Sequence, residues 1–235
     1  GSTTDGGARL FFSTTLRDWT NLILAVDASA RRWSRFATLP LGQRLHCLEW
    51  HGGLLYVAGG IVDGAYVDTL HAFNETTGSW ANLPPMPHAT AQASSGVIGN
   101  QLLIAGGCGV DHQALSTLQI YDFATQTWRL GAPLPHAVRN ACGIVIDAKL
   151  YLFPSRWSTS GGRTFVYDVQ SNTWTEQLPN RNTASDGAMH AFAHNDLIVG
   201  VHRHNLEFHH GTWNSSRGLG TPGIMHGVAG SVILG

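Results

Sequence analysis

The chain has 235 residues, a formal net charge of −1 at pH 7 and 43% hydrophobic residues. This length is sufficient for a single all-β domain with a large core, and the near-neutral charge excludes the broad basic surface that nucleic acids or acidic membranes attract. Three widely spaced cysteines cannot form a paired disulfide framework, which is typical of a reducing compartment. We therefore expect a cytoplasmic or nuclear protein.

Both ends of the chain bear on its domain organisation. Residues 1–2 read Gly-Ser and resemble a cloning remnant, so they are set aside. We interpret residues 3–235 as one domain. Because the sequence stops directly after an apolar stretch at residues 231–235, we expect this domain to have been excised from a longer protein.

Five tryptophans recur along the chain, each following a polar turn. Successive members of the series are 47, 48, 46 and 39 residues apart. A repeat of roughly 40 to 50 residues that contains short strands and turns is typical of a propeller blade. The tryptophans of this series are Trp33, Trp80, Trp128, Trp174 and Trp213.

Each repeat has the same order of short segments. An apolar run such as residues 142–146 precedes a second strand that ends in Gly-Gly, as at residues 59–60 and 106–107. A loop of variable length and an aromatic strand such as residues 118–122 follow, and then the tryptophan and a Leu-Pro step. Short β-branched and aromatic runs bounded by turn residues predict four strands per repeat. The glycines are expected where the backbone kinks and packs closely on the neighbouring sheet.

This order of motifs, with the Gly-Gly strand, a Tyr-Asp step and then tryptophan, resembles the kelch repeat over about residues 8–235. The Tyr-Asp step is present at Tyr121-Asp122 and at Tyr167-Asp168. Kelch repeats fold as four-stranded blades around a central channel. The resemblance and the five tryptophans therefore imply an all-β propeller of five four-stranded blades.

The two ends of the chain supply complementary parts of a blade. Residues 9–13 resemble a strand with no inner strand before it, and residues 223–235 resemble the inner-strand segment at residues 187–200 with no outer strands after it. We expect the C-terminal strand to complete the first blade and to close the ring. Closure would hide two strand edges that could otherwise pair with other chains.

One position in the repeat is occupied by charged residues. Alignment of the repeats on their second strand places Arg44, Ala91, Arg139 and Asp186 at the same point, just before the inner strand. By the resemblance, kelch domains that bind peptides use this loop and the loop after Gly-Gly, on one face. Arginines there could hold a carboxylate and aromatic residues could anchor a partner, or the arginines could satisfy loop carbonyls. The predicted partner-binding residues are Arg44, Tyr66, Arg139, Arg156, Trp157, Arg163 and Asp186.

Other polar residues receive structural interpretations. His202 and His204 form the densest histidine group, but no acidic residue or cysteine lies at zinc-ligand spacing, so we expect no metal and no cofactor. Cys47 and Cys142 occupy equivalent repeat positions and are expected to be buried core thiols. Asn74, in a glycosylation-like sequence, is interpreted as a turn residue.

The resemblance implies a protein-interaction module that is not itself catalytic. Many kelch-domain proteins are substrate receptors of cullin-RING ubiquitin ligases, so this domain would hold a degron peptide or protein loop on its arginine-bearing face. The ligase would bind through regions outside this sequence. Two alternatives stay open: a kelch-type sugar epimerase or mutarotase, for which Arg139 and Asp186 could converge, and a cytoskeletal or scaffold propeller.

Overall fold

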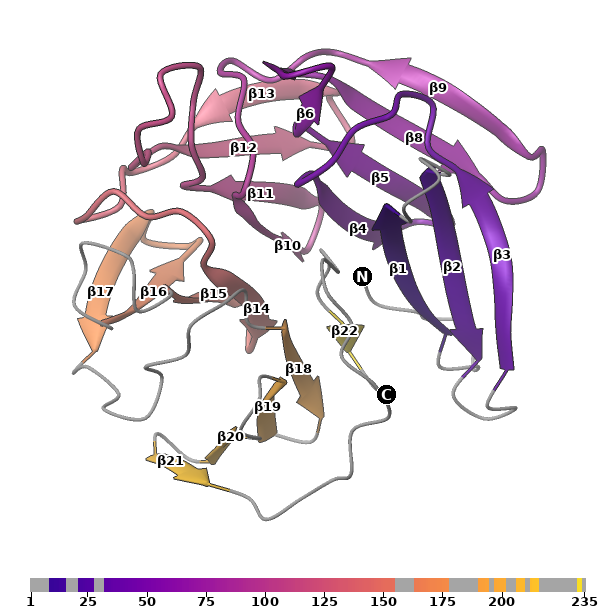
Figure 1. Cartoon of the computed structure of the whole chain (residues 1–235). Coiled ribbons are helices and arrows are strands. Elements are labelled where there is room, and N and C mark those ends of the chain that lie inside the picture. Colours follow the sequence, from indigo (N-terminus) through magenta and orange to yellow (C-terminus); the bar gives the residue numbers. More distant parts are fainter. Residues whose placement is uncertain are drawn as a thin grey trace.

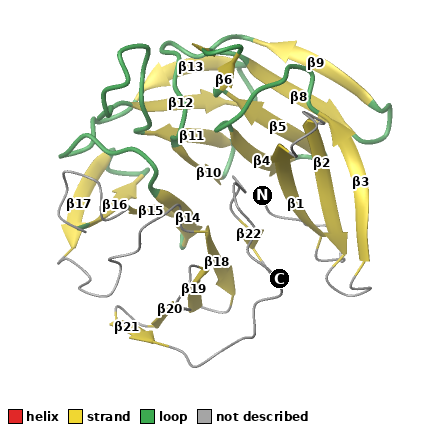
Figure 2. Ribbon diagram, in the orientation of Figure 1, coloured by secondary structure: helices red, strands yellow, loops and turns green. Residues whose placement is uncertain are grey.

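The computed structural model describes residues 9–15, 21–27, 32–154, 163–177, 190–194, 197–201, 206–209, 212–215 and 232–233. These residues contain 22 strands, and Figure 2 shows strands joined by loops throughout this part of the chain. None of the described residues belongs to a helix long and apolar enough to cross a bilayer. The prediction of an all-β fold is confirmed.

Five sheets form the blades, and apart from the last strand of the chain, their strands pair antiparallel in the order of the sequence. The first blade has β1 (Arg9–Thr15), β2 (Asn21–Asp27) and β3 (Arg32–Thr38). The second has β4 (Cys47–His51), β5 (Leu54–Ala58), β8 (Leu70–Asn74) and β9 (Ser79–Leu83). The third has β10 (Ser94–Ile98), β11 (Gln101–Ala105), β12 (Leu118–Asp122) and β13 (Thr127–Leu130).

The fourth blade has β14 (Cys142–Ile146), β15 (Lys149–Phe153), β16 (Thr164–Asp168) and β17 (Thr173–Gln177). The fifth has β18 (His190–His194), β19 (Leu197–Val201), β20 (Leu206–His209) and β21 (Thr212–Ser215), with β22 (Val232–Ile233) beside β18. A small hairpin of β6 (Ile61–Val62) and β7 (Ala65–Tyr66) lies between β5 and β8 in sequence. Figure 1 shows the blades around a centre, with β4, β10, β14 and β18 innermost.

The C-terminal strand does not pair as the sequence suggested. We expected it to complete the first blade, but β22 is hydrogen-bonded to β18 of the fifth blade in parallel, through Phe192 with Val232 and Ala193 with Ile233. It also lies against β1, so Figure 1 shows it between the first and fifth blades. Innermost strands present backbone groups along their edges, and a short strand between two such edges can add to either one. The first blade therefore has three strands among the described residues.

The hydrophobic core is divided into clusters that lie between adjacent blades. Phe11 and Ile23 of the first blade pack in one cluster with Leu55 of the second. A further cluster joins the second and third blades, and another joins the third and fourth, where Leu103 and Phe165 are fully buried. The second and third sheets thus bury residues on both faces, which explains why consecutive positions of their inner strands are apolar.

The Gly-Gly pairs lie where one blade meets the next. Gly60 and Gly107 have φ values of +106° and +92°, a region that other residues enter only with strain. The Gly60 N–H donates to the carbonyl of Thr90 and the Gly107 N–H to that of Val138, both at 2.8 Å and both in the following blade. A Cβ on Gly107 would lie 2.6 Å from the carbonyl oxygen of Ala91. The glycines are therefore needed for backbone conformation and for close packing.

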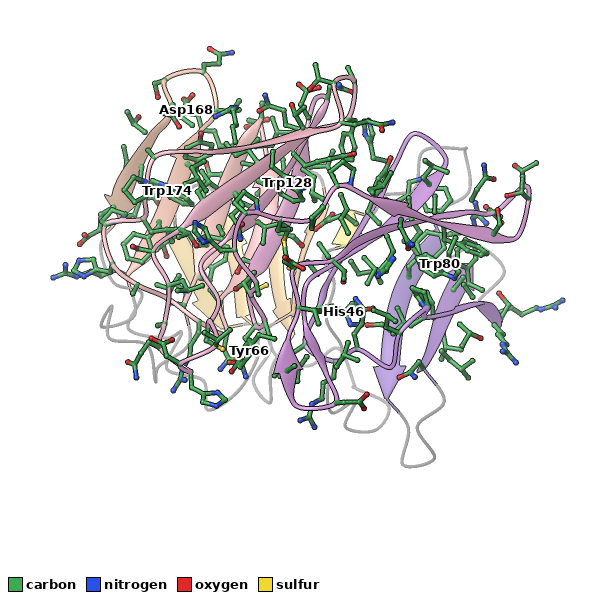
Figure 3. The ribbon with its side chains drawn as sticks, turned by 90° about the horizontal axis from the view of Figure 1, so that it is seen from above. His46, Tyr66, Trp80, Trp128, Asp168 and Trp174 are labelled. Carbon is green, nitrogen blue, oxygen red and sulfur yellow. The ribbon has the colours of Figure 1, made fainter. Side chains whose placement is uncertain are left out.

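The repeated tryptophans also join neighbouring blades (Figure 3). Each indole N–H donates to a main-chain carbonyl at the end of the preceding blade, and each ring packs on an aromatic residue of its own blade. The three bonds run from Trp80 to Thr38 (3.0 Å), from Trp128 to Pro84 (2.8 Å) and from Trp174 to Ala132 (2.9 Å). Packing between sheets is confirmed for these tryptophans, whereas the side chains of Trp33 and Trp213 lie outside the described part of the chain.

The turns between the two outer strands are held by an Asx contact. In each turn, one side-chain oxygen accepts hydrogen bonds from the backbone N–H groups two and three residues further along the chain. The accepting residues are Asn74, Asp122 and Asp168. These bonds hold the pKa values of Asp122 and Asp168 below the ordinary carboxyl value. The Tyr-Asp step thus ends a strand and begins a turn, and the interpretation of Asn74 as a turn residue is confirmed.

His46 is a buried polar residue beside the first Gly-Gly pair. Its Nδ1 lies 3.1 Å from the carbonyl oxygen of Gln43 and so donates to it, while Nε2 has no hydrogen-bond partner within the described residues. The side chain packs on Gly60, whose ideal Cβ would lie 3.1 Å from the His46 Cβ. Burial lowers the pKa of His46 from 6.5 to about 4, because the charged ring would lose its hydration.

Replacement of Gly107 by alanine is expected to destabilise the protein more than the same change at Gly99. Gly99 also has a positive φ (+56°), but a Cβ there meets no atom within 4 Å, so Gly99→Ala should cost about 1 kcal/mol of unfolding free energy. Gly107→Ala adds a clash with the Ala91 carbonyl, on the segment that leads into β10 of the same blade, and should cost about 3 kcal/mol or more. Urea unfolding measures both. Equal losses would show that the packing of Gly107 against the segment before β10 tolerates a Cβ.

Trp128→Phe is expected to lower the unfolding free energy by about 1 kcal/mol, because it leaves the Pro84 carbonyl without its indole donor while keeping an aromatic ring. Tyr121→Phe is the matched control, since the buried Tyr121 hydroxyl has no hydrogen-bond partner among the described residues and its loss should be neutral or slightly stabilising. Thermal and urea unfolding of both variants test this. An unaffected Trp128→Phe variant would remove the indole bond from the account of blade packing.

Acidification is expected to destabilise the protein through His46. The folded-state pKa of about 4 lies below the value of 6.5 for an exposed histidine, so the unfolded chain binds the proton first as the pH falls. The neutral, buried His46 therefore costs no stability above pH 6.5. As the pH falls from 6.5 to about 4, the unfolding free energy decreases, by roughly 3 kcal/mol in total. Urea unfolding of the wild type and of His46→Gln at pH 7, 5.5 and 4 should give the variant a flatter pH dependence. Parallel pH profiles would refute the assignment.

Candidate functional site

Two sets of loops emerge at the same edge of the blades. In the second blade, Cys47 at the start of β4 and Leu70 at the start of β8 both lie opposite Ala58 at the end of β5. The loop that leads into the inner strand, here called the approach loop, therefore meets the loop after Gly-Gly, here called the return loop. We call this edge the loop face. Figure 3 shows Tyr66 of a return loop and Asp168 of an outer turn on opposite sides of the molecule.

Approach and return loops of one blade are joined by backbone pairing. Arg44 forms a bridge with Ile61, and Ile61 pairs with Tyr66 in the β6–β7 hairpin. The corresponding pairs in the third blade are Ala91 with Cys108 and Cys108 with Ala114. Arg44 and Ala91 thus occupy equivalent positions, and Tyr66 stands where the third blade has an alanine. Backbone pairing fixes the loops, so their side chains project from a rigid base.

Tyr66 reaches from the second blade to the return loop of the third. Its hydroxyl lies 2.6 Å from Nδ1 of His112, with the two rings edge to face at 5.3 Å between centroids. The same hydroxyl lies 3.5 Å from Sγ of Cys108. The Cys108 thiol is buried and donates to Oε1 of Gln92 at 3.1 Å. These contacts hold the tyrosine ring and the histidine ring in one arrangement on the loop face.

The electrostatics of this contact keep Tyr66 neutral. Its hydrogen bond with Cys108 and its partial burial raise the pKa of Tyr66 to about 12, although the charge of Arg139 opposes the increase. The hydroxyl therefore keeps its proton at neutral pH and can act as both donor and acceptor.

Arg139 extends the same network to the fourth blade. It lies on the approach loop of that blade, and its Nη1 donates to the main-chain carbonyl of His112 at 3.0 Å. The guanidinium carries five N–H donors, and the His112 carbonyl uses one of them. Arg139 is exposed on the loop face, so its charge faces any partner that approaches there.

The other predicted residues have different surroundings. Arg44 is exposed on the approach loop of the second blade. Its backbone pairs with Ile61, which in turn pairs with Tyr66. Arg163 forms an ion pair with Glu176 on β17, at 2.8 Å between Nη1 and Oε1, and also contacts His136. The structure therefore brings Arg44, Tyr66 and Arg139 into one band. Arg163 belongs to a separate ion pair within the fourth blade.

Three predicted site residues, Arg156, Trp157 and Asp186, lie outside the described residues. Conversely, sequence reasoning did not select His112 and Gln92, which the structure places in the Tyr66 network. His112 has a left-handed backbone (φ +61°) in a return loop. An exposed histidine at such a position gives no repeat signal, because the equivalent residues of other blades differ.

The cysteines and acidic residues do not suggest another centre. Cys47, Cys108 and Cys142 are buried thiols, as expected for Cys47 and Cys142. Burial raises the pKa of Cys47 to about 12, so its thiol is neutral and inert at physiological pH. In the part of the chain that the structure describes, no three His, Cys, Asp or Glu side chains gather closely enough to hold a metal ion.

Comparison with known proteins agrees with the blade geometry. The family model described as the KLHDC2/KLHL20/DRC7 Kelch-repeats domain matches residues 15–202. A solved structure titled "Structure of YjhT" is similar with a TM-score of 0.77 and 17% sequence identity, over 94% of this chain and 84% of that chain. At this identity the likeness concerns the fold alone. The repeated Gly-Gly, Tyr-Asp and tryptophan contacts and the family match together establish that the chain belongs to the kelch-repeat family of β-propellers.

Proposed function

We propose that this propeller recognises a degron peptide or protein loop through its loop face and is the substrate-recognition domain of a cullin-RING ubiquitin ligase in the cytoplasm or nucleus. The kelch family generally binds protein partners, which supports the interaction role. In this proposal the propeller itself is not catalytic, and the ligase binds through regions outside this sequence.

The observation that carries the proposal is a band of side chains across three consecutive blades. Arg44 and Tyr66 come from the second blade, His112 from the third and Arg139 from the fourth, and backbone bridges or hydrogen bonds connect them. A surface assembled from several repeats on a rigid scaffold is the usual way in which repeat proteins bind a partner.

The chemistry of this band favours an acidic partner. Arginine presents a planar array of donors that matches a carboxylate, and such charge-assisted hydrogen bonds are stronger than neutral ones. Tyr66 adds an aromatic surface with a neutral hydroxyl. Because the whole chain carries a net charge of only −1, attraction depends on this local pair of arginines. We therefore expect a peptide with an acidic side chain or a C-terminal carboxylate.

Loss of both arginines is expected to weaken binding of acidic peptides at least tenfold, because each contact to a carboxylate is charge-assisted. Peptide pools with acidic side chains, and pools with free or amidated C-termini, are titrated against the wild type and Arg44→Ala/Arg139→Ala by fluorescence polarisation. Arg129→Ala/Lys149→Ala is the matched control, since it removes the same charge from β13 and β15, where Lys149 faces Asp168. Equal affinity of the wild type and the Arg44/Arg139 variant would overturn the loop-face assignment.

The ligase part of the proposal needs a separate measurement. The full-length protein should co-purify with a cullin subunit from cells, and a reporter fused to the selected peptide should be degraded by the proteasome. Degradation should stop in the Arg44→Ala/Arg139→Ala variant. Peptide binding without a cullin partner would favour a scaffold propeller. Binding of sugars but of no peptide would favour the epimerase or mutarotase alternative.

A further inference from the structure

Three residues at the inner end of the approach loops have left-handed backbones. Leu45, Gln92 and Asn140 have φ values of +59°, +57° and +53°, and each lies two residues before an innermost strand. They are connected in series, since the Gln92 N–H donates to the Leu45 carbonyl (2.9 Å) and the Asn140 N–H to the Gln92 carbonyl (3.0 Å). We call these three residues the inner rim of the loop face.

Among the three residues of the inner rim, Leu45 is the residue type least suited to a left-handed backbone. Asparagine adopts a left-handed backbone readily, so Asn140 suits its position, whereas a leucine Cβ crowds the following carbonyl. Leu45 is also 42% exposed and belongs to none of the three core clusters. A leucine that is both strained and exposed does not stabilise the folded state through core packing. Such strain concentrates at functional sites.

The loops of the loop face carry both apolar and cationic groups. Arg44 directly precedes Leu45, and Arg139 directly precedes Asn140, so each arginine is adjacent in sequence to a member of the inner rim. Val110, on the return loop that also carries His112, is 75% exposed. The Gln92 side chain is already engaged by the Cys108 thiol. Leu45 is therefore the apolar member of the inner rim, adjacent to Arg44 in sequence and joined to the segment of Arg139 through Gln92 and Asn140.

Resting on the proposed function, we propose that Leu45 determines the specificity of the loop face by packing on an apolar side chain of the bound peptide, next to the carboxylate that Arg44 and Arg139 hold. Charge complementarity selects the acidic group, and removal of two apolar side chains from water selects its neighbour. The partner is thus an acidic peptide with a leucine-like residue adjacent to its carboxylate. An apolar contact of this kind is worth roughly 10- to 100-fold in affinity.

The inference predicts opposite effects of one substitution on stability and on binding. Leu45→Asn places a residue suited to the left-handed region, so the melting temperature should rise. Affinity for a peptide with leucine beside its acidic residue should fall at least fivefold, and affinity for the same peptide with glycine in place of that leucine should not change. Leu45→Ala should show the same loss of selectivity without the gain in melting temperature.

Leu130→Asn is the matched control, because Leu130 is a similarly exposed leucine (53%) on the outer strand β13. It should bind both peptides as the wild type does. If the wild type binds both acidic peptides but Leu45→Asn keeps the preference for leucine, the inference is overturned while the proposed function stands. If the wild type binds neither peptide, the proposed function fails and the inference fails with it.

Discussion

Close contact between the backbones of consecutive blades is the constraint on which the rest of this structure depends. The second glycine of a Gly-Gly pair donates to a carbonyl of the next blade, from Gly60 to Thr90 and from Gly107 to Val138. A Cβ on the first glycine of a pair would collide with a carbonyl of the next blade, that of Thr90 for Gly59 and that of Val138 for Gly106. Trp80, Trp128 and Trp174 each add a bond toward the preceding blade. The second and third blades are therefore held on both sides.

The same contacts make the loop face rigid. Because the glycines bring the approach loop of one blade against the return loop of another, backbone bridges such as Leu115 with Val138 can form between them. Loop side chains can then change without changing the scaffold. This separation of fold from recognition explains how one repeat supports different surfaces. In this chain it places two arginines, a neutral tyrosine and a histidine in one band across three blades.

Two features of the band concern recognition more than stability. The Tyr66–His112 contact crosses from one blade to the next through exposed loops, where a hydrogen bond contributes little to folding. Leu45 takes a conformation that disfavours leucine and remains exposed. Local sequence and global fold disagree at these places, and such disagreement is expected where a surface serves a partner.

The sequence by itself determined the repeat, the all-β class, the role of the glycines and the position of Trp80, Trp128 and Trp174, because these depend on short segments that recur at 46 to 48 residues. It also indicated that Arg44 and Arg139 share a face. Only the tertiary structure showed that Tyr66 meets His112, because this contact joins loops without repeat equivalents. Only the tertiary structure also showed that the last strand pairs with the fifth blade. The edges of the first and fifth blades offer the same backbone groups, so the sequence of the strand does not determine which edge it joins.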